Sequence, residues 1–146
     1  PALEALAEGR ERQGRVEDAV AIRARLMELK TPTPAQLVRT GELAMSVGNT
    51  EVALRAFERA RAAQGASFRH DLELGVLYVA ARRFQEARAA LDRVPPSHPG
   101  YPMALFKRAQ VSVLLGEPDR SARIAAAKEH ADETTRTLIA NERLFQ

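Results

Sequence analysis

The fold is decided by residues 74–91, which read LGVLYVAARRFQEARAAL. Apolar residues recur three and four positions apart on both sides of residues 81–83, and this spacing places them on one face of a helix. Each apolar stretch is short, and the arginines between them are typical of an exposed turn. The segment therefore predicts two short helices that pack against each other as a hairpin.

The same pattern recurs along the chain with a period of 34 residues. Small, turn and apolar positions all keep this spacing, which coincidence does not produce over so many positions. The aligned sets are Gly41, Gly75 and Ala109; Gly48, Arg82 and Gly116; and Phe57, Leu91 and Ala125. One period earlier the register continues as Ala7 and Gly14, with Arg23 where Phe57 falls in the next copy. We therefore expect four helical hairpins, over residues 1–33, 34–67, 68–101 and 102–130.

Small residues at fixed positions have a mechanical reason. Gly41 and Gly75 lack a β-carbon, so the two helices of a pair can approach closely there. Phe57 and Leu91 then fill the space between one copy and the next. A single hairpin of this size buries too little apolar surface to fold alone, so we expect stability to come from stacking of neighbouring copies.

Local signals predict several helix ends. Thr33, Pro34 and Gln36 form a capping box with proline in the first turn. Gly48 is suited to the left-handed conformation that ends a helix, and Asn49 to capping the next helix. Further expectations are that Gly9 and Arg10 interrupt the first helix, that the last hairpin's second helix begins at Pro118, and that Asp132 and Glu133 begin a final helix with Ala131, Leu138 and Phe145 on one face.

This pattern resembles the tetratricopeptide repeat family. The third copy carries the clearest motif, with Leu74, Gly75, Tyr78, Ala87, Leu91 and Pro99; the second keeps Gly41, Ala53, Phe57 and Ala60, and the outer copies are degenerate. The resemblance implies an all-α, right-handed α-solenoid of about four repeats. It also implies that residues 131–146 form a capping helix. The alternative is that this segment docks on a partner through Leu138, Ile139, Leu144 and Phe145.

The composition excludes several kinds of site and segment. The 146 residues hold 22 Lys and Arg, 19 Asp and Glu, and 45% apolar residues, a mixture typical of a globular domain. Zero cysteines exclude disulfides and thiolate metal sites. No apolar run approaches the roughly 20 residues of a membrane-spanning helix. Because the sequence begins with Pro1, we expect a fragment or processed product, and its compartment is open, with cytoplasm and periplasm both compatible.

The sequence gives little support for catalysis or for nucleic-acid binding. The sequence pairs no candidate nucleophile with a general base, and His70, His98 and His130 are expected to be exposed polar residues. We therefore expect no enzyme activity, no cofactor and no metal. The arginines are interleaved with glutamates and lack neighbouring aromatics that could stack on bases, so we expect no nucleic-acid partner.

The resemblance places a partner on the concave surface that the first helix of each pair lines. Residues off the packing face would form it: Ala35, Val38, Glu42, Met45, Arg69, Leu72, Val76, Val79, Met103, Phe106, Gln110 and Val113, flanked by Arg39, Glu73 and Lys107. This largely apolar stripe suits a peptide or helix. Leu72, Val76 and Phe106 equally allow packing between repeats. The asparagine pair with which some family members grip a peptide C-terminus is absent.

Two functions follow from this interpretation. The first is a protein-interaction scaffold that binds a peptide or helix of a protein partner in the groove. The alternative is an accessory repeat region of a larger enzyme or membrane-anchored protein, serving assembly or self-association. Exposed apolar residues around Leu3 and Leu6 would favour the alternative.

Overall fold

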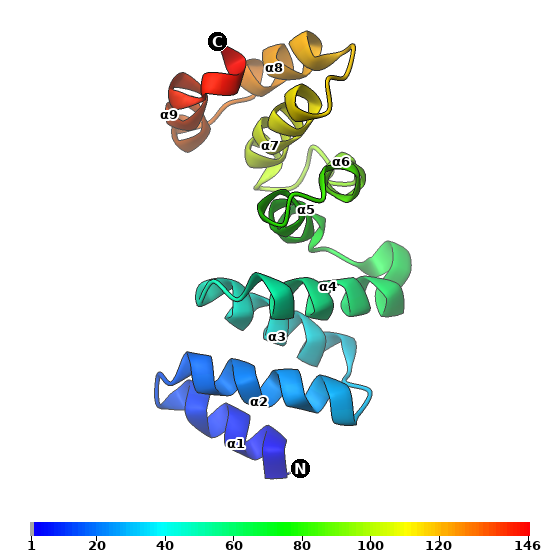
Figure 1. Cartoon of the computed structure of the whole chain (residues 1–146), viewed down its shortest axis with the longest axis vertical. Helices are drawn as coiled ribbons and strands as arrows, with labels where there is room; N and C mark the ends of the chain where they lie inside the picture. The colour runs from blue at the N-terminus through cyan, green and yellow to red at the C-terminus, as the bar shows by residue number, and fades with distance from the viewer. Residues whose placement is uncertain (1) are drawn as a thin grey trace. The chain divides into compact units, whose positions relative to one another are not determined.

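The computed structural model describes residues 2–146, and every regular element in this range is helical. The chain divides into two compact units, which we call unit 1 (residues 1–69) and unit 2 (residues 70–146). Within each unit, helices adjacent in sequence pack as pairs (Figure 1). The prediction of an all-α fold built from helical hairpins is confirmed.

Unit 1 contains two hairpins. Its elements are α1 (Ala2–Arg12), α2 (Val16–Leu29), α3 (Pro34–Ser46), α4 (Thr50–Gln64) and the short 3-10 helix η1 (Gly65–Ser67). Helix α1 packs on α2, α3 packs on α4, and α2 packs on α3. Behind α4, the buried ring of Phe68 meets the ring of Phe57 edge-on at 6.5 Å between centroids, which closes the end of the second hairpin.

Unit 2 also contains two hairpins, followed by a further helix. Its elements are α5 (Asp71–Ala80), α6 (Phe84–Asp92), α7 (Tyr101–Leu114), α8 (Arg120–Glu129), α9 (Glu133–Asn141) and the 3-10 helix η2 (Arg143–Phe145). Helix α7 is central to this unit, because it packs against α5, α6, α8 and α9 as well as η2. Helix α7 therefore links α5, the first helix of the preceding hairpin, to the final helix α9 (Figure 1).

The repeat is visible in the backbone as well as in the sequence. The turn between the two helices of each hairpin contains one residue in the left-handed region: Gly14 (φ 72°), Gly48 (φ 72°), Arg82 (φ 60°) and Gly116 (φ 65°). These four positions keep the 34-residue spacing. Arg82 is the one non-glycine residue with positive φ among the described residues, and a side chain makes this conformation costly.

Close helix contact explains the glycines of the middle copies. A Cβ atom built on Gly41 would lie 2.6 Å from Cε2 of Phe57, and one on Gly75 would lie 2.6 Å from Cδ2 of Leu91. Both distances are far inside van der Waals contact, so each large side chain occupies the space that the glycine leaves. The packing role predicted for this glycine position is confirmed in both copies.

The predicted caps of the second hairpin are also confirmed. The Thr33 hydroxyl accepts a hydrogen bond from the Gln36 N–H at 3.2 Å, and the Thr33 N–H donates to Gln36 Oε1 at 2.8 Å. Asn49 Oδ1 accepts from the Val52 N–H at 3.2 Å and begins α4. These bonds satisfy backbone donors that have no partner inside their helices.

Three sequence predictions about helix ends were wrong. Helix α1 runs through Gly9 and Arg10 without a break, because one glycine costs only about 1 kcal/mol in a helix and packing on α2 offsets it. Helix α8 begins at Arg120 rather than Pro118, since Glu117 accepts hydrogen bonds from arginines on α6 and α7 and holds the chain in a turn. Helix α9 ends at Asn141, so Phe145 belongs to η2 and not to a continuous helical face.

Candidate protein-interaction surface

In unit 1, the predicted groove residues of α3 are split between exposed and half-buried positions. Val38 and Met45 are half-buried, whereas Ala35, Arg39 and Glu42 are exposed. The Arg39 guanidinium donates to Glu11 Oε2 at 2.9 Å, so this arginine links α3 to α1. Arg69, also predicted for the groove, donates to the carbonyls of Ala66 and Phe68 and stays near its own turn.

In unit 2, helix α5 presents four predicted groove residues that are all half-buried: Leu72, Glu73, Val76 and Val79. Leu72 lies against Gly100, where a Cβ atom would collide with its Cδ2. The Glu73 carboxylate lies 3.7 Å from Nδ1 of His70. Val76 and Val79 keep part of their apolar surface exposed on a helix that packs against α7.

Helix α7 carries the remaining predicted groove residues, and these residues differ in how exposed they are. Met103, Lys107, Gln110 and Val113 are half-buried. Phe106 is only 3% exposed, and the Phe145 ring meets it edge-on at 5.7 Å between centroids. Phe106 therefore does not present an open apolar surface, in contrast to the expectation for a vacant groove.

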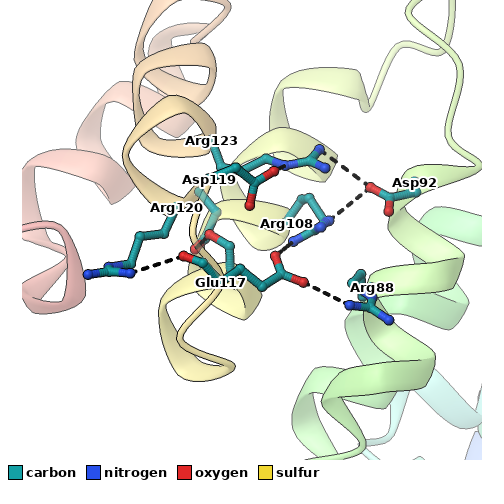
Figure 2. Close-up of polar contacts among 9 residues, drawn as sticks. Arg88, Asp92, Arg108, Glu117, Asp119, Arg120 and Arg123 are labelled. Carbon is teal, nitrogen blue, oxygen red and sulfur yellow. Dashed lines mark hydrogen bonds and ion pairs between the residues drawn. The ribbon is translucent and has the colours of Figure 1, made fainter.

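A cluster of charged residues that the sequence analysis did not single out lies beside this surface. Arg108 is 4% exposed, although the equivalent position of the preceding copy is Leu74. Its Nε donates to Asp92 Oδ1 at 2.8 Å and its Nη1 donates to Glu117 Oε2 at 2.7 Å (Figure 2). The signal in the sequence was an arginine at the repeat position that holds Leu74 in the third copy, and its carboxylate partners could not be read from the repeat spacing.

The carboxylates of this cluster join three helices. Glu117, in the turn after α7, also accepts from Nη1 of Arg88 on α6 at 3.1 Å. Asp92, at the end of α6, lies 3.6 Å from Nη1 of Arg123 on α8 (Figure 2). Burial acts to raise the pKa of Glu117, but the hydrogen bonds from Arg108 and Arg88 outweigh it and hold the pKa below its ordinary value.

Unit 1 contains a related arrangement around Glu11. Arg23 stands at the Phe57 position of the repeat and is 8% exposed. Its guanidinium donates to Glu11 Oε1 at 2.6 Å, and Arg39 donates to the other carboxylate oxygen. Burial raises the pKa of Glu11, yet these hydrogen bonds bring it below the ordinary range. One carboxylate therefore bridges two arginines here as Glu117 does in unit 2.

The described residues give little support for a metal site, a membrane-spanning helix or a large ligand cavity. Among residues 2–146, no three potential metal-ligating side chains of His, Asp or Glu gather within reach of one ion. None of the helices described combines the length and the apolar character that crossing a membrane requires. A cavity of about 40 Å³ between α1, α2 and α3 is lined by Glu4, Arg23, Leu26, Lys30, Gln36 and Thr40, and its volume is too small for a peptide.

The paired helices, the 34-residue register and the buried seams define a helical repeat protein. Residues 38–102 match the tetratricopeptide repeat family, which confirms the resemblance for the two copies that carry its motif most clearly. A search among curated proteins gives no match. Tetratricopeptide repeats generally mediate protein–protein interactions, and they are typically not catalytic.

Proposed function

We propose that the chain is a protein-interaction module and that unit 2 binds a peptide or helix of a partner on the face formed by α5 and α7. The observation that carries this proposal is the set of half-buried apolar side chains on two helices that pack together: Val76 and Val79 on α5, Met103 and Val113 on α7. In unit 1, Val38 and Met45 give α3 a smaller stripe of the same kind.

The chemistry of this face favours a largely apolar ligand. Partly exposed valine and methionine side chains gain free energy when a partner covers them, at about 25 cal/mol per Å² of apolar surface. Lys107 and Glu73 flank them with one charge of each sign, so polar groups of the ligand would fix its direction. Methionine adapts to ligands of different shape, which suits recognition of short peptides.

A peptide screen tests this proposal. The chain is immobilised and used to select binders from a displayed library of random peptides, and selected peptides are titrated against a Val76→Glu/Val79→Glu variant. We expect a loss of affinity of about ten-fold or more, since charges would replace apolar contacts at the centre of the face. The matched control is Ala89→Glu, at an exposed position of α6, and it should bind as the unaltered chain does. Equal binding by both folded variants would contradict the proposal.

A second candidate function, self-association or assembly, is favoured by the exposure of α1. Leu6 is 44% exposed, whereas the equivalent residues Thr40, Leu74 and Arg108 are buried. In sedimentation equilibrium, a chain that associates through this face should become monomeric with Leu6→Arg and stay associated with Ala21→Arg, a control at an exposed position of α2. A monomer at all concentrations before substitution would exclude this candidate.

A further inference from the structure

We propose that the part of α7 around Phe106 and Gln110 is a binding site for an aromatic peptide segment, and that residues 142–145 of the chain occupy it in place of a partner. The inference extends the proposed function, since it rests on α7 being part of the binding surface and names the ligand chemistry there. The site comprises Phe106, Lys107 and Gln110; we call residues 142–145 the tail.

The apolar half of the site is an aromatic contact. The Phe145 ring meets the Phe106 ring edge-on, with an interplanar angle of 78° and 5.7 Å between centroids. This is the geometry that the charge distribution of aromatic rings favours. Lys107 Nζ lies over the Phe106 ring at 5.6 Å from its centroid, so this ring also makes a cation–π contact. Phe145 thus fills a place that an aromatic side chain from another protein would fit.

The polar half of the site is the Gln110 amide. Gln110 Nε2 donates to Glu142 Oε2, and Glu142 Oε1 accepts from the Leu144 N–H at 2.9 Å. The Glu142 carboxylate therefore binds α7 and also shapes the turn that delivers Phe145. The carboxylate fixes the orientation of the amide, because the flipped amide would set its oxygen against a negative charge.

The tail satisfies only part of this site. Gln110 Oε1 is buried and accepts no hydrogen bond from any described residue, and a buried acceptor without a donor is unfavourable. A bound peptide could supply the donor from a backbone N–H. The tail is a single 3-10 turn in which Arg143 and Leu144 are exposed. The side chains that attach it to α7 are therefore those of Glu142 and Phe145. We infer that a partner segment with an acidic residue three positions before an aromatic residue displaces it.

A titration with the tail as a separate peptide tests the inference. The probe is a synthetic peptide of residues 141–146, Asn-Glu-Arg-Leu-Phe-Gln, followed by backbone amide shifts in the NMR spectrum of the labelled chain. Three forms of the full chain are compared: unaltered, Phe145→Ala, and Leu144→Ala, a neighbouring control whose side chain is 37% exposed. A chain that ends at Asn141 provides a fourth.

We expect the peptide to shift the amides of Phe106, Lys107 and Gln110 in the shortened chain and in Phe145→Ala. Binding to the unaltered and Leu144→Ala chains should be about ten-fold weaker or more, because the attached tail competes at a high effective concentration. A peptide with alanine in place of phenylalanine should not bind. The inference is overturned if no α7 amide shifts in Phe145→Ala, or if all forms bind equally; Phe145→Ala decides the matter should the shortened chain not fold.

These outcomes separate the inference from the proposed function. Tail binding at α7, together with library peptides that ignore Val76 and Val79, would overturn the proposed function and leave the α7 site standing. Library peptides that depend on those valines, with no tail binding at α7, would overturn the inference alone.

Discussion

The α3/α4 pair of unit 1 and the α7/α8 pair of unit 2 occupy equivalent positions in the repeat but are held together differently. Helix α4 buries six residues, all of them apolar: Val52, Ala53, Leu54, Ala56, Phe57 and Ala60. Among the residues of α8, all of which the structure describes, Ala127 is the one that is buried. The α7/α8 pair instead has Arg108 and Arg123, both bonded to carboxylates.

This difference follows the family pattern. The family match covers residues 38–102, where Gly41 meets Phe57 and Gly75 meets Leu91. Arg23 and Arg108 lie outside that range; Arg23 takes the position of Phe57 and Leu91, and Arg108 takes the position of Thr40 and Leu74. Each is buried and bonded to a glutamate. Where the repeat motif weakens, a buried arginine with a bridging carboxylate replaces part of the apolar packing.

The largest expected effect is the loss of the Phe57 side chain. Phe57→Ala should lower the free energy of unfolding of unit 1 by about 3–5 kcal/mol, because the ring is 0% exposed and its removal leaves a cavity against Gly41. Urea denaturation measures the change. Ile124→Ala, at a half-buried position of α8, should cost only about 1 kcal/mol. Equal losses of unfolding free energy in the two variants would contradict the difference between the α3/α4 and α7/α8 pairs.

The next largest effect concerns the Arg108 cluster. Glu117→Ala should destabilise unit 2 by about 3 kcal/mol, because it takes a carboxylate from an arginine whose side chain is 5% exposed. Arg108→Leu should cost less than about 1 kcal/mol, since leucine is the residue of the third copy and Glu117 keeps Arg88. Thermal unfolding of both variants decides the order; a costlier Arg108→Leu would show that the arginine is irreplaceable.

A smaller effect is expected at Gly41, and its sign should depend on Phe57. Gly41→Ala places a methyl group against the ring and should cost about 1–2 kcal/mol net. In the Phe57→Ala background the same change should stabilise by up to about 1 kcal/mol, because alanine is the better helix former and the space is then vacant. A double-mutant cycle measures this coupling. Additive effects would contradict the close contact.

The smallest effect is a gain at Arg82. Its φ of 60° is a left-handed conformation that the other three copies give to glycine. Arg82→Gly should stabilise unit 2 by about 0.5 kcal/mol, since relief of about 1–2 kcal/mol of backbone strain exceeds the extra entropy loss of glycine. Calorimetry should show the melting temperature rise, whereas Gly48→Ala, the reverse change in unit 1, should lower it.

The sequence predicted the repeat because the repeat depends on local and periodic features. Gly41, Gly75 and the left-handed turns stand at fixed spacing, so their roles follow from position alone. The pairing of Arg108 with Asp92 and Glu117 was not predictable in this way, because those carboxylates lie outside the aligned positions and reach Arg108 only in the folded unit. The coverage of Phe106 by Phe145 depends on where α9 ends, which helical spacing over residues 131–146 did not indicate.

The central claim is that buried arginine–glutamate contacts hold the outer hairpins, and their pH dependence follows from the glutamates. Burial acts to raise the pKa of Glu11 and Glu117, but arginine hydrogen bonds leave both below the ordinary value of 4.5. A depressed pKa in the folded state means that the unfolded chain takes up protons first as the pH falls. This stabilisation is therefore complete above about pH 4.5 and is lost as the pH falls through the folded-state pKa values.

Native-state hydrogen exchange at about pH 6.5 and about pH 3.5 tests this claim most directly, because it gives an opening free energy for each helix. The account predicts that amides of α2 and α8 lose protection at the lower pH, beyond the change in intrinsic exchange rate, while amides of α4 keep theirs. Equal losses in α2, α4 and α8, or none in α2 and α8, would contradict it.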